Sequence, residues 1–222
     1  MEIDYLISSS GLGTSSFGPS GHQELLSSAS FSDSDARLAI EAATELGLGF
    51  FLGFAPPEAH NFFYEFPKAG GAPSCFATRV NHAGTNARPW KGERDFPMAQ
   101  VLLMAPPDLM PGVRKRFGEL APGLSQVLCT SPYGDGCQWL EVYPEGVSKG
   151  RAAERLARSL GLGAGDAVAL GNDHNDTDLL AWAGDAFVSS DAPESLKALH
   201  ENMPRAGEGS LDYVLKRYLG KV

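Results

Sequence analysis

The sequence predicts an α/β fold in which a parallel-sheet core is interrupted by an inserted α+β block. Three observations lead to this prediction. Short apolar runs alternate with helical patterns in the first third of the chain, and the last third returns to that alternation. Between them lie two consecutive strand-like runs with antiparallel potential. At 222 residues the chain is long enough for one domain with such an insert.

The first third indicates a βαβ unit. Residues 3–7 are expected to form a buried strand, and the Ser/Gly-rich stretch 8–32 is too polar and small to be core. A helix capped by Asp33 or Ser34 follows. The apolar run 49–54 is typical of a parallel strand, which completes the unit.

The middle and the last third supply the insert and the second half of the core. Residues 72–90 are expected to be irregular. Further along the chain we expect strands over 98–105, 125–131, 138–144, 167–170 and 186–190, and helices over 110–120, 149–160, 178–182 and 211–219. The predicted core therefore covers residues 1–80 and 146–222, and the predicted cap covers residues 81–145.

Composition limits the classes of function. The net charge of −9 argues against a nucleic-acid surface, and the small basic cluster Arg114, Lys115 and Arg116 is interpreted as a solvated helix face. No apolar stretch approaches the roughly 18 residues of a membrane span, and the N-terminus has no basic region of a signal peptide. We therefore expect a cytoplasmic protein that contacts neither nucleic acid nor membrane.

The cysteines are three in number and widely spaced. No two of Cys75, Cys129 and Cys137 form a CxxC pair. This pattern favours a reducing compartment, without a disulfide framework and without a structural zinc site.

The densest polar run is ALGNDHNDTDLL, residues 169–180, which follows directly on an apolar strand. The carboxyl ends of strands are where open α/β sheets place their ligands. Carboxylate and amide oxygens suit Mg²⁺, which takes one or two carboxylates together with waters and phosphate. The alternative is a helix N-terminus, where Asp and Asn cap free N–H groups, and this alternative is strongest for Asp176 and Asp178.

Lys149 stands in a Ser-Lys-Gly sequence at the start of a predicted helix. A lysine near a helix N-terminus is unfavourable with the helix dipole alone. It is explained if the ammonium group reaches an anion or a carboxylate cluster as a point charge. The alternative is an ordinary exposed lysine.

Together these segments resemble a known family. VSKG, ARSLGL and ALGNDHNDTDLLAWAG are similar to the third and fourth motifs of the haloacid dehalogenase (HAD) superfamily, in particular its Cof-like and sucrose-phosphatase-like branch with a type-2 cap. The resemblance implies a Rossmannoid parallel-sheet core with an inserted α+β cap. It also implies a Mg²⁺-dependent phosphohydrolase of small phosphorylated metabolites, possible examples being sugar phosphates.

The resemblance carries over to particular residues in the last third. Lys149 takes the role of the phosphate-binding lysine, and Asp173 and Asp176 take the roles of the metal-associated acids. Asn172 stands where many members have the first Asp of the motif, so it joins the expected metal set.

The first motif departs from the family pattern. Aligning its strand and DxDGT turn on Leu6 to Thr14 keeps Gly13 and Thr14, the expected phosphate-binding residues, in register. Ser10 then replaces the nucleophilic Asp and Leu12 replaces the acid/base Asp. Moving the register to Ser8 and Ser10 brings no carboxylate.

Other interpretations of the first third add no catalytic group. Phe54 stands where the second motif has its Thr or Ser, and Pro19 occupies the lysine position of a P-loop. His174 is the one candidate base for Ser10. The stretch 8–32 is either an anion-binding nest of free N–H groups or a flexible polar loop.

Two functions follow from these observations. The first is a HAD-type phosphatase scaffold, catalytically impaired because Ser10 and Leu12 replace two aspartates. The second is a non-catalytic relative that binds a phosphorylated ligand or a protein partner. The sequence leaves both open.

Overall fold

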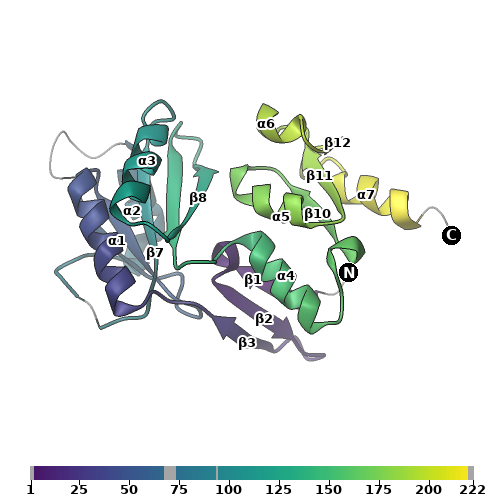
Figure 1. The fold of residues 1–222 in the computed structure, drawn as a ribbon, viewed down its shortest axis with the longest axis horizontal. Coiled ribbons are helices and arrows are strands. Elements are labelled where there is room, and N and C mark those ends of the chain that lie inside the picture. Colours follow the sequence, from purple (N-terminus) through teal and green to yellow (C-terminus); the bar gives the residue numbers. More distant parts are fainter. Residues whose placement is uncertain (1–2, 68–73, 94, 220–222) are drawn as a thin grey trace. The chain divides into compact units, whose positions relative to one another are not determined.

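The computed structural model describes residues 3–67, 74–93 and 95–219 (Figure 1). The chain divides into two compact units, residues 1–147 and 148–222. Residues 72 and 73 of the stretch expected to be irregular lie outside the described part. The rest of that stretch contains regular elements, so the expectation of irregular structure is wrong there.

Unit 1 is built on a six-stranded sheet in the order β6-β5-β4-β7-β9-β8. Its strands are β4 (Phe50–Phe54), β5 (Phe62–Glu65), β6 (Ala87–Pro89), β7 (Met98–Ala105), β8 (Ser125–Thr130) and β9 (Gln138–Tyr143). All neighbours are antiparallel except β5 and β6. The two consecutive strands predicted over 125–131 and 138–144 are confirmed as the antiparallel pair β8–β9.

The prediction of β4 as a parallel strand is wrong. β4 pairs antiparallel with β5 on one side and with β7 on the other. Only seven residues, 55–61, join β4 to β5, and a parallel connection needs a crossover of a dozen residues or more. The first third therefore forms no βαβ unit.

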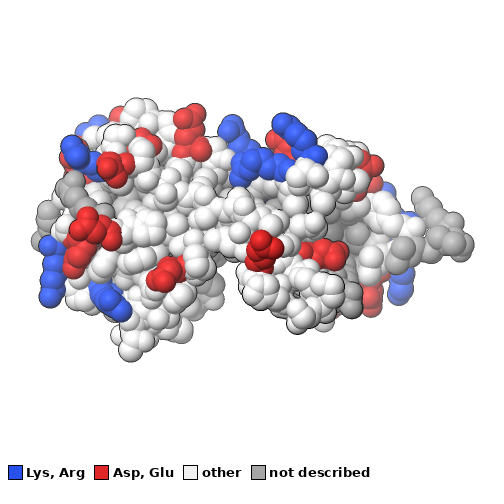
Figure 2. Space-filling model, turned by 90° about the horizontal axis from the view of Figure 1, so that it is seen from below, with Lys and Arg blue, Asp and Glu red and all other residues white. Residues whose placement is uncertain are grey.

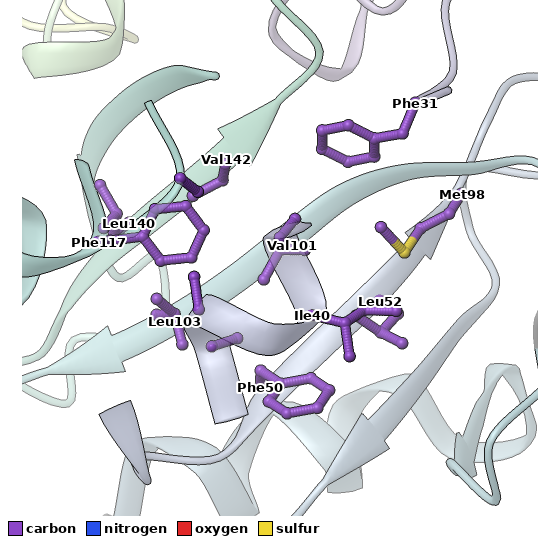
Figure 3. Close-up of a cluster of buried hydrophobic side chains, with 14 of the residues drawn as sticks. Phe31, Ile40, Phe50, Leu52, Met98, Val101, Leu103, Phe117, Leu140 and Val142 are labelled. Carbon is purple, nitrogen blue, oxygen red and sulfur yellow. The ribbon is translucent and has the colours of Figure 1, made fainter. Parts of the chain in front are cut away.

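β4 has the composition of a parallel strand because both of its faces are buried. Phe50 and Leu52 pack on one side with β7 and with the helices α1 (Asp33–Leu46) and α3 (Met110–Leu120), in the cluster that Figure 3 shows. Phe51 packs on the other side with Phe76 of α2 (Ser74–Ala83). An antiparallel sheet covered on both faces gives the same continuous apolar run as a parallel strand.

The N-cap of α1 lies one residue before Asp33 and two before Ser34, the two predicted caps. Ser32 is the N-cap, and its Oγ accepts from the N–H of Asp35 at 3.2 Å. Gly47 ends the helix at φ 68°, in the left-handed region where glycine is favoured. Asp33 and Asp35 lie in the first turn, where their charge is favourable to the helix dipole.

The N-terminal segment forms a separate three-stranded antiparallel sheet, β1-β2-β3. Its strands are β1 (Tyr5–Ser8), β2 (Gly13–Phe17) and β3 (Gln23–Ser28). The expected strand 3–7 is shorter and only partly buried, since Leu6 is 41% exposed. The sequence predicts an anion-binding nest or a flexible polar loop within 8–32, but β2 and β3 occupy much of this stretch.

Unit 2 carries the parallel sheet that the sequence predicts for the core. β10 (Val168–Gly171), β11 (Asp185–Ser189) and β12 (Glu201–Met203) pair in parallel in that order. The helices are α4 (Lys149–Ser159), α5 (Thr177–Trp182), α6 (Glu194–Lys197) and α7 (Ser210–Leu219). The predictions missed α6 and β12, because each is only three or four residues long.

The expected domain boundary at residues 80 and 81 does not coincide with an edge of the six-stranded sheet. β4 and β5 come before that boundary, and the other four strands of the same sheet come after it. In the described part of the chain, no helix is both long and apolar enough to cross a membrane. Acidic and basic side chains are interspersed on the face in Figure 2, with uncharged surface between them.

The cysteine prediction is also wrong. Cys75 of α2 and Cys137 form a disulfide with Cα atoms 6.4 Å apart, and Cys129 is a buried free thiol. The two partners are 62 residues apart in sequence, so only the fold brings them together. Spacing within the sequence gives no sign of such a pair.

Candidate functional site

The Lys149 cluster, defined as Lys149 and the loop Asn172–Asp176, lies at the carboxyl end of β10 in unit 2. β10 ends at Gly171, and the loop leads into α5. A Cβ on Gly171 would lie 2.7 Å from the Cβ of Asp176. The absence of a side chain at 171 therefore lets the loop fold back tightly against the end of the strand.

Lys149 and Asp176 form a close ion pair. Lys149 Nζ donates to Asp176 Oδ1 at 2.5 Å, and the Asp176 side chain is 8% exposed, against 29% for Lys149. Lys149 is the first residue of α4, where a cation opposes the helix dipole. The buried carboxylate offsets that penalty, and it explains why a lysine is stable at this position.

The second oxygen of Asp176 is used within the loop. Asp176 Oδ2 accepts from the N–H of Asn172 at 2.8 Å and from the N–H of Asp173 at 3.3 Å. Both carboxylate oxygens thus have partners inside unit 2. In this arrangement Asp176 holds Lys149 and closes the loop, which differs from the metal-ligand role expected for it.

Asp173 caps the short 3₁₀ helix that follows it. Asp173 Oδ1 accepts from the N–H of His174 at 2.8 Å, and the capping interaction is reciprocal with Asp176. The capping alternative that the sequence left open is therefore present in the structure. Asn172 is exposed beside it.

The donor atoms at the end of β10 match the needs of Mg²⁺ only in part. Among the described residues, no group of three or more His, Cys, Asp or Glu is arranged to hold a metal ion. Asp173 and Asn172 nevertheless bring one carboxylate and one amide oxygen to the strand end, and Mg²⁺ usually keeps several waters beside one or two carboxylates. By donor chemistry these two residues fit part of a Mg²⁺ shell, whereas Asp176 does not.

Asp178, for which the sequence favours a helix cap, also joins two helices. Its Oδ2 accepts from the N–H of Gly150 at 2.8 Å, which joins α5 to the start of α4. A Cβ on Gly150 would lie 2.6 Å from the carbonyl oxygen of Asp178. The glycine directly after Lys149 is the sequence signal that α4 approaches another backbone there.

The residues predicted for the first motif lie together in unit 1, on the turn between β1 and β2. Ser8 pairs with Gly13 across the two antiparallel strands. Gly13 and Thr14 belong to β2, and Leu12 is 3% exposed in an apolar cluster with Ala55, Ala99, Tyr143 and Val147. The parallel strand on which the first-motif assignment depended is therefore wrong.

A polar network that the sequence does not predict holds this turn. Ser9 and Ser10 have φ values of 48° and 54°, which non-glycine residues seldom adopt. Ser10 Oγ donates to Glu141 Oε2 at 3.1 Å. Tyr143 donates to the same oxygen at 2.8 Å, and the Gln100 amide donates to Glu141 Oε1 at 3.1 Å.

Tyr143 is fully buried at the centre of that network. Burial raises its pKa well above 10, and the neighbouring Glu141 charge raises the pKa further. The phenol therefore stays neutral and donates to Glu141. Gln100, Glu141 and Tyr143 come from β7 and β9, so the Ser9–Ser10 turn is fixed against the large sheet.

The comparisons with known proteins agree with the fold. The family of haloacid dehalogenase-like hydrolases matches residues 23–203, which is more than half of the chain. The HMP-PP phosphatase of Serratia proteamaculans (strain 568) is 40% identical over 72 residues, or 32% of this chain and 25% of that protein. The HMP-PP phosphatase of Escherichia coli O8 (strain IAI1) is 37% identical over 68 residues, or 31% of this chain and 25% of that protein.

Solved structures resemble the whole chain at low sequence identity. A HAD subclass IIB sugar phosphatase has a TM-score of 0.74 at 14% identity, covering 99% of this chain and 77% of that one. A HAD-superfamily phosphatase from Bacteroides thetaiotaomicron also has a TM-score of 0.74, at 17% identity, covering 99% of this chain and 75% of that one. The fold is thus the α/β HAD fold with a cap, and the chain belongs to the family of haloacid dehalogenase-like hydrolases.

Proposed function

We propose that the chain acts as a Mg²⁺-dependent phosphatase of small phosphorylated metabolites, with the Lys149 cluster binding the phosphoryl group. The observation that carries the proposal is the ion pair of Lys149 with the buried Asp176 at the carboxyl end of β10. The family membership supports hydrolysis as the type of reaction. Sugar phosphates and HMP-PP, named for the relatives, are the first substrates to test.

In this proposal the residues of the cluster have separate roles. Lys149 binds phosphoryl oxygens as a point charge, and Asp176 is a positioning residue that holds the ammonium group. Asp173 and Asn172 hold the metal, which when bound supplies positive charge against the phosphate. We propose no catalytic role for Ser10 and Leu12, or phosphate binding for Gly13 and Thr14, because they lie in an antiparallel hairpin.

Impaired catalysis stays a prediction from the sequence. It rests on the absence of carboxylates at Ser10 and Leu12, where the family pattern has two catalytic aspartates. The pairing of β1 with β2 is antiparallel, so the turn that carries these two residues is a hairpin turn. We also propose that the six-stranded sheet of unit 1 with α1, α2 and α3 is the cap, and that unit 2 belongs to the core.

The proposal is tested by phosphate release from an aryl phosphate, a set of sugar phosphates and HMP-PP, with and without Mg²⁺. Lys149→Ala should lower turnover by about 10²–10³, since one group stabilising transition-state charge contributes about that much. Lys197→Ala is the matched control, because Lys197 also forms an ion pair within unit 2, with Glu194 at 2.5 Å.

The binding of inorganic phosphate is measured in addition to turnover. Titration with inorganic phosphate, followed by NMR, reports on Lys149 even where no substrate in the set is hydrolysed. Phosphate binding lost in Lys149→Ala without turnover of any substrate would favour the non-catalytic relative. Equal phosphate binding in the wild type and in Lys149→Ala contradicts the assignment of the cluster.

A further inference from the structure

Unit 1 contains a cavity that no part of the proposed function uses. It has a volume of about 470 Å³ and lies between α3 and the strands β8 and β9. Met110, Arg114, Lys115 and Gly118 of α3 line one side, and Gln126 and Leu128 of β8 line another. The cavity therefore sits beside β8, the last strand of the large sheet.

The charge at the cavity is positive and unbalanced. Arg114 and Lys115 form no ion pair with any described residue. Arg116, the next residue on the same helix, pairs with Glu45 at 2.6 Å and with Glu119 at 3.2 Å. In a chain with a net charge of −9, two such cations beside one cavity favour an anion there.

A buried polar atom at the cavity also lacks a partner. Gln126 Oε1 is buried and accepts no hydrogen bond from the described residues. An unsatisfied buried acceptor is destabilising, and in native proteins it points to a missing partner. A ligand with an N–H or O–H group would supply that hydrogen bond once the Gln126 amide turns toward the cavity, since Oε1 itself is buried.

Apart from Gln138 of β9, the remaining walls are apolar, and the space depends on a glycine. Met110 is buried, and Leu128 packs against the same core cluster. A Cβ on Gly118 would lie 2.8 Å from Gln126 Nε2, so a side chain at 118 would occupy the position of that amide. The bare helix surface at Gly118 leaves room for the Gln126 side chain at the cavity.

We propose that this cavity binds a small organic anion that carries an apolar body and a hydrogen-bond donor. Arg114 and Lys115 bind the anionic group, Met110 and Leu128 contact the apolar body, and Gln126 accepts from the donor. The basic cluster on α3 then has a binding role in addition to being solvated.

The probe for this site is 8-anilinonaphthalene-1-sulfonate, which combines a sulfonate, two aromatic systems and one N–H donor. Its fluorescence is titrated with the full chain. One saturable site is expected, and Arg114→Gln should weaken the affinity about tenfold, as expected for one lost charge-assisted contact. Arg116→Gln removes the same charge from the same helix and should leave the affinity unchanged.

A second variant separates ligand binding from folding. Gln126→Met removes the unsatisfied acceptor, so the urea midpoint of unfolding should stay the same or rise, while the affinity for the probe falls. Gly118→Met should fill the cavity and abolish the site. Equal affinity of Arg114→Gln and Arg116→Gln, or undiminished binding by Gln126→Met, would overturn the proposal.

Discussion

Two loops of this chain follow short strands and are rich in small polar residues, but their polar atoms have different surroundings. In unit 1, the turn after β1 directs Ser10 to Glu141 and buries Leu12. In unit 2, the loop after β10 uses Asp176 to hold the partly exposed Lys149. The first loop is bound to a sheet by its own hydrogen bonds, whereas the second presents a cation at a strand end.

The comparison teaches that a polar turn after a strand is not by itself a phosphate site. What distinguishes the two loops is the sheet to which the strand belongs. The loop after β10 is at the carboxyl end of a parallel sheet, where ligands bind in α/β folds. The turn after β1 joins two antiparallel strands, where a tight turn is the ordinary connection.

The largest expected effect comes from removing the carboxylate in the unit 2 loop. Asp176→Ala leaves the Lys149 ammonium and two backbone N–H groups without their acceptor. We expect the free energy of unfolding to fall by about 3 kcal/mol, which is typical of breaking a buried pair. Urea unfolding measures this loss. Glu154→Ala breaks the exposed pair with Arg158 and should have an effect of less than about 1 kcal/mol.

A smaller effect is expected from adding one methyl group to the same loop. Gly171→Ala places a Cβ 2.7 Å from the Cβ of Asp176, so the loop must move away from the strand. Overpacking of this kind destabilises by about 1–3 kcal/mol. Thermal unfolding checks it against Gly165→Ala, where a Cβ has nothing within 4 Å. Equal stability of the two variants would contradict the tight loop.

The unit 1 network should be visible in the pH dependence of stability. Burial raises the Tyr143 pKa well above 10 in the folded state, so the folded protein holds this proton more tightly than the unfolded chain. The resulting stability is complete below about pH 10 and is lost as the pH rises through the folded pKa. Unfolding of the wild type and of Tyr143→Phe, measured between about pH 8 and 11, tests this. A decline of equal slope in both proteins would contradict it.

The smallest expected effect concerns the strained turn itself. Ser10→Ala loses the hydrogen bond to Glu141 and keeps the positive φ, so we expect a loss of about 1 kcal/mol. Ser10→Gly loses the same bond, but glycine adopts positive φ without strain. Chemical denaturation should therefore find Ser10→Gly more stable than Ser10→Ala. The reverse order would show that the turn is not strained at Ser10.

The sequence predicted the unit 2 loop well because its information is local. The apolar strand, the acidic run and the Lys-Gly pair at a helix start are each readable within a few residues. The sequence did not show which acidic residue has which role in the loop. Asp176 and Asp173 are the same residue type, and only the folded loop shows that Asp176 has used both of its oxygens.

The pairing in unit 1 could not be predicted because it depends on contacts that are distant in sequence. The strands β4, β7, β8 and β9 and the helices α1 and α3 were located closely from periodicity and turn residues. The partners of β4, the network around Glu141 and the Cys75–Cys137 bond instead join segments tens of residues apart. Apolar composition alone does not tell a parallel strand from an antiparallel strand buried on both faces.

The disulfide makes unit 1 resistant to separation after backbone cleavage. The ring closed by Cys75 and Cys137 contains β6, β7, α3 and β8, and these include the middle of the large sheet. A single cut anywhere inside the ring leaves both fragments covalently joined. After such a cut the oxidised chain would migrate as one species on a denaturing gel, and the reduced chain as two.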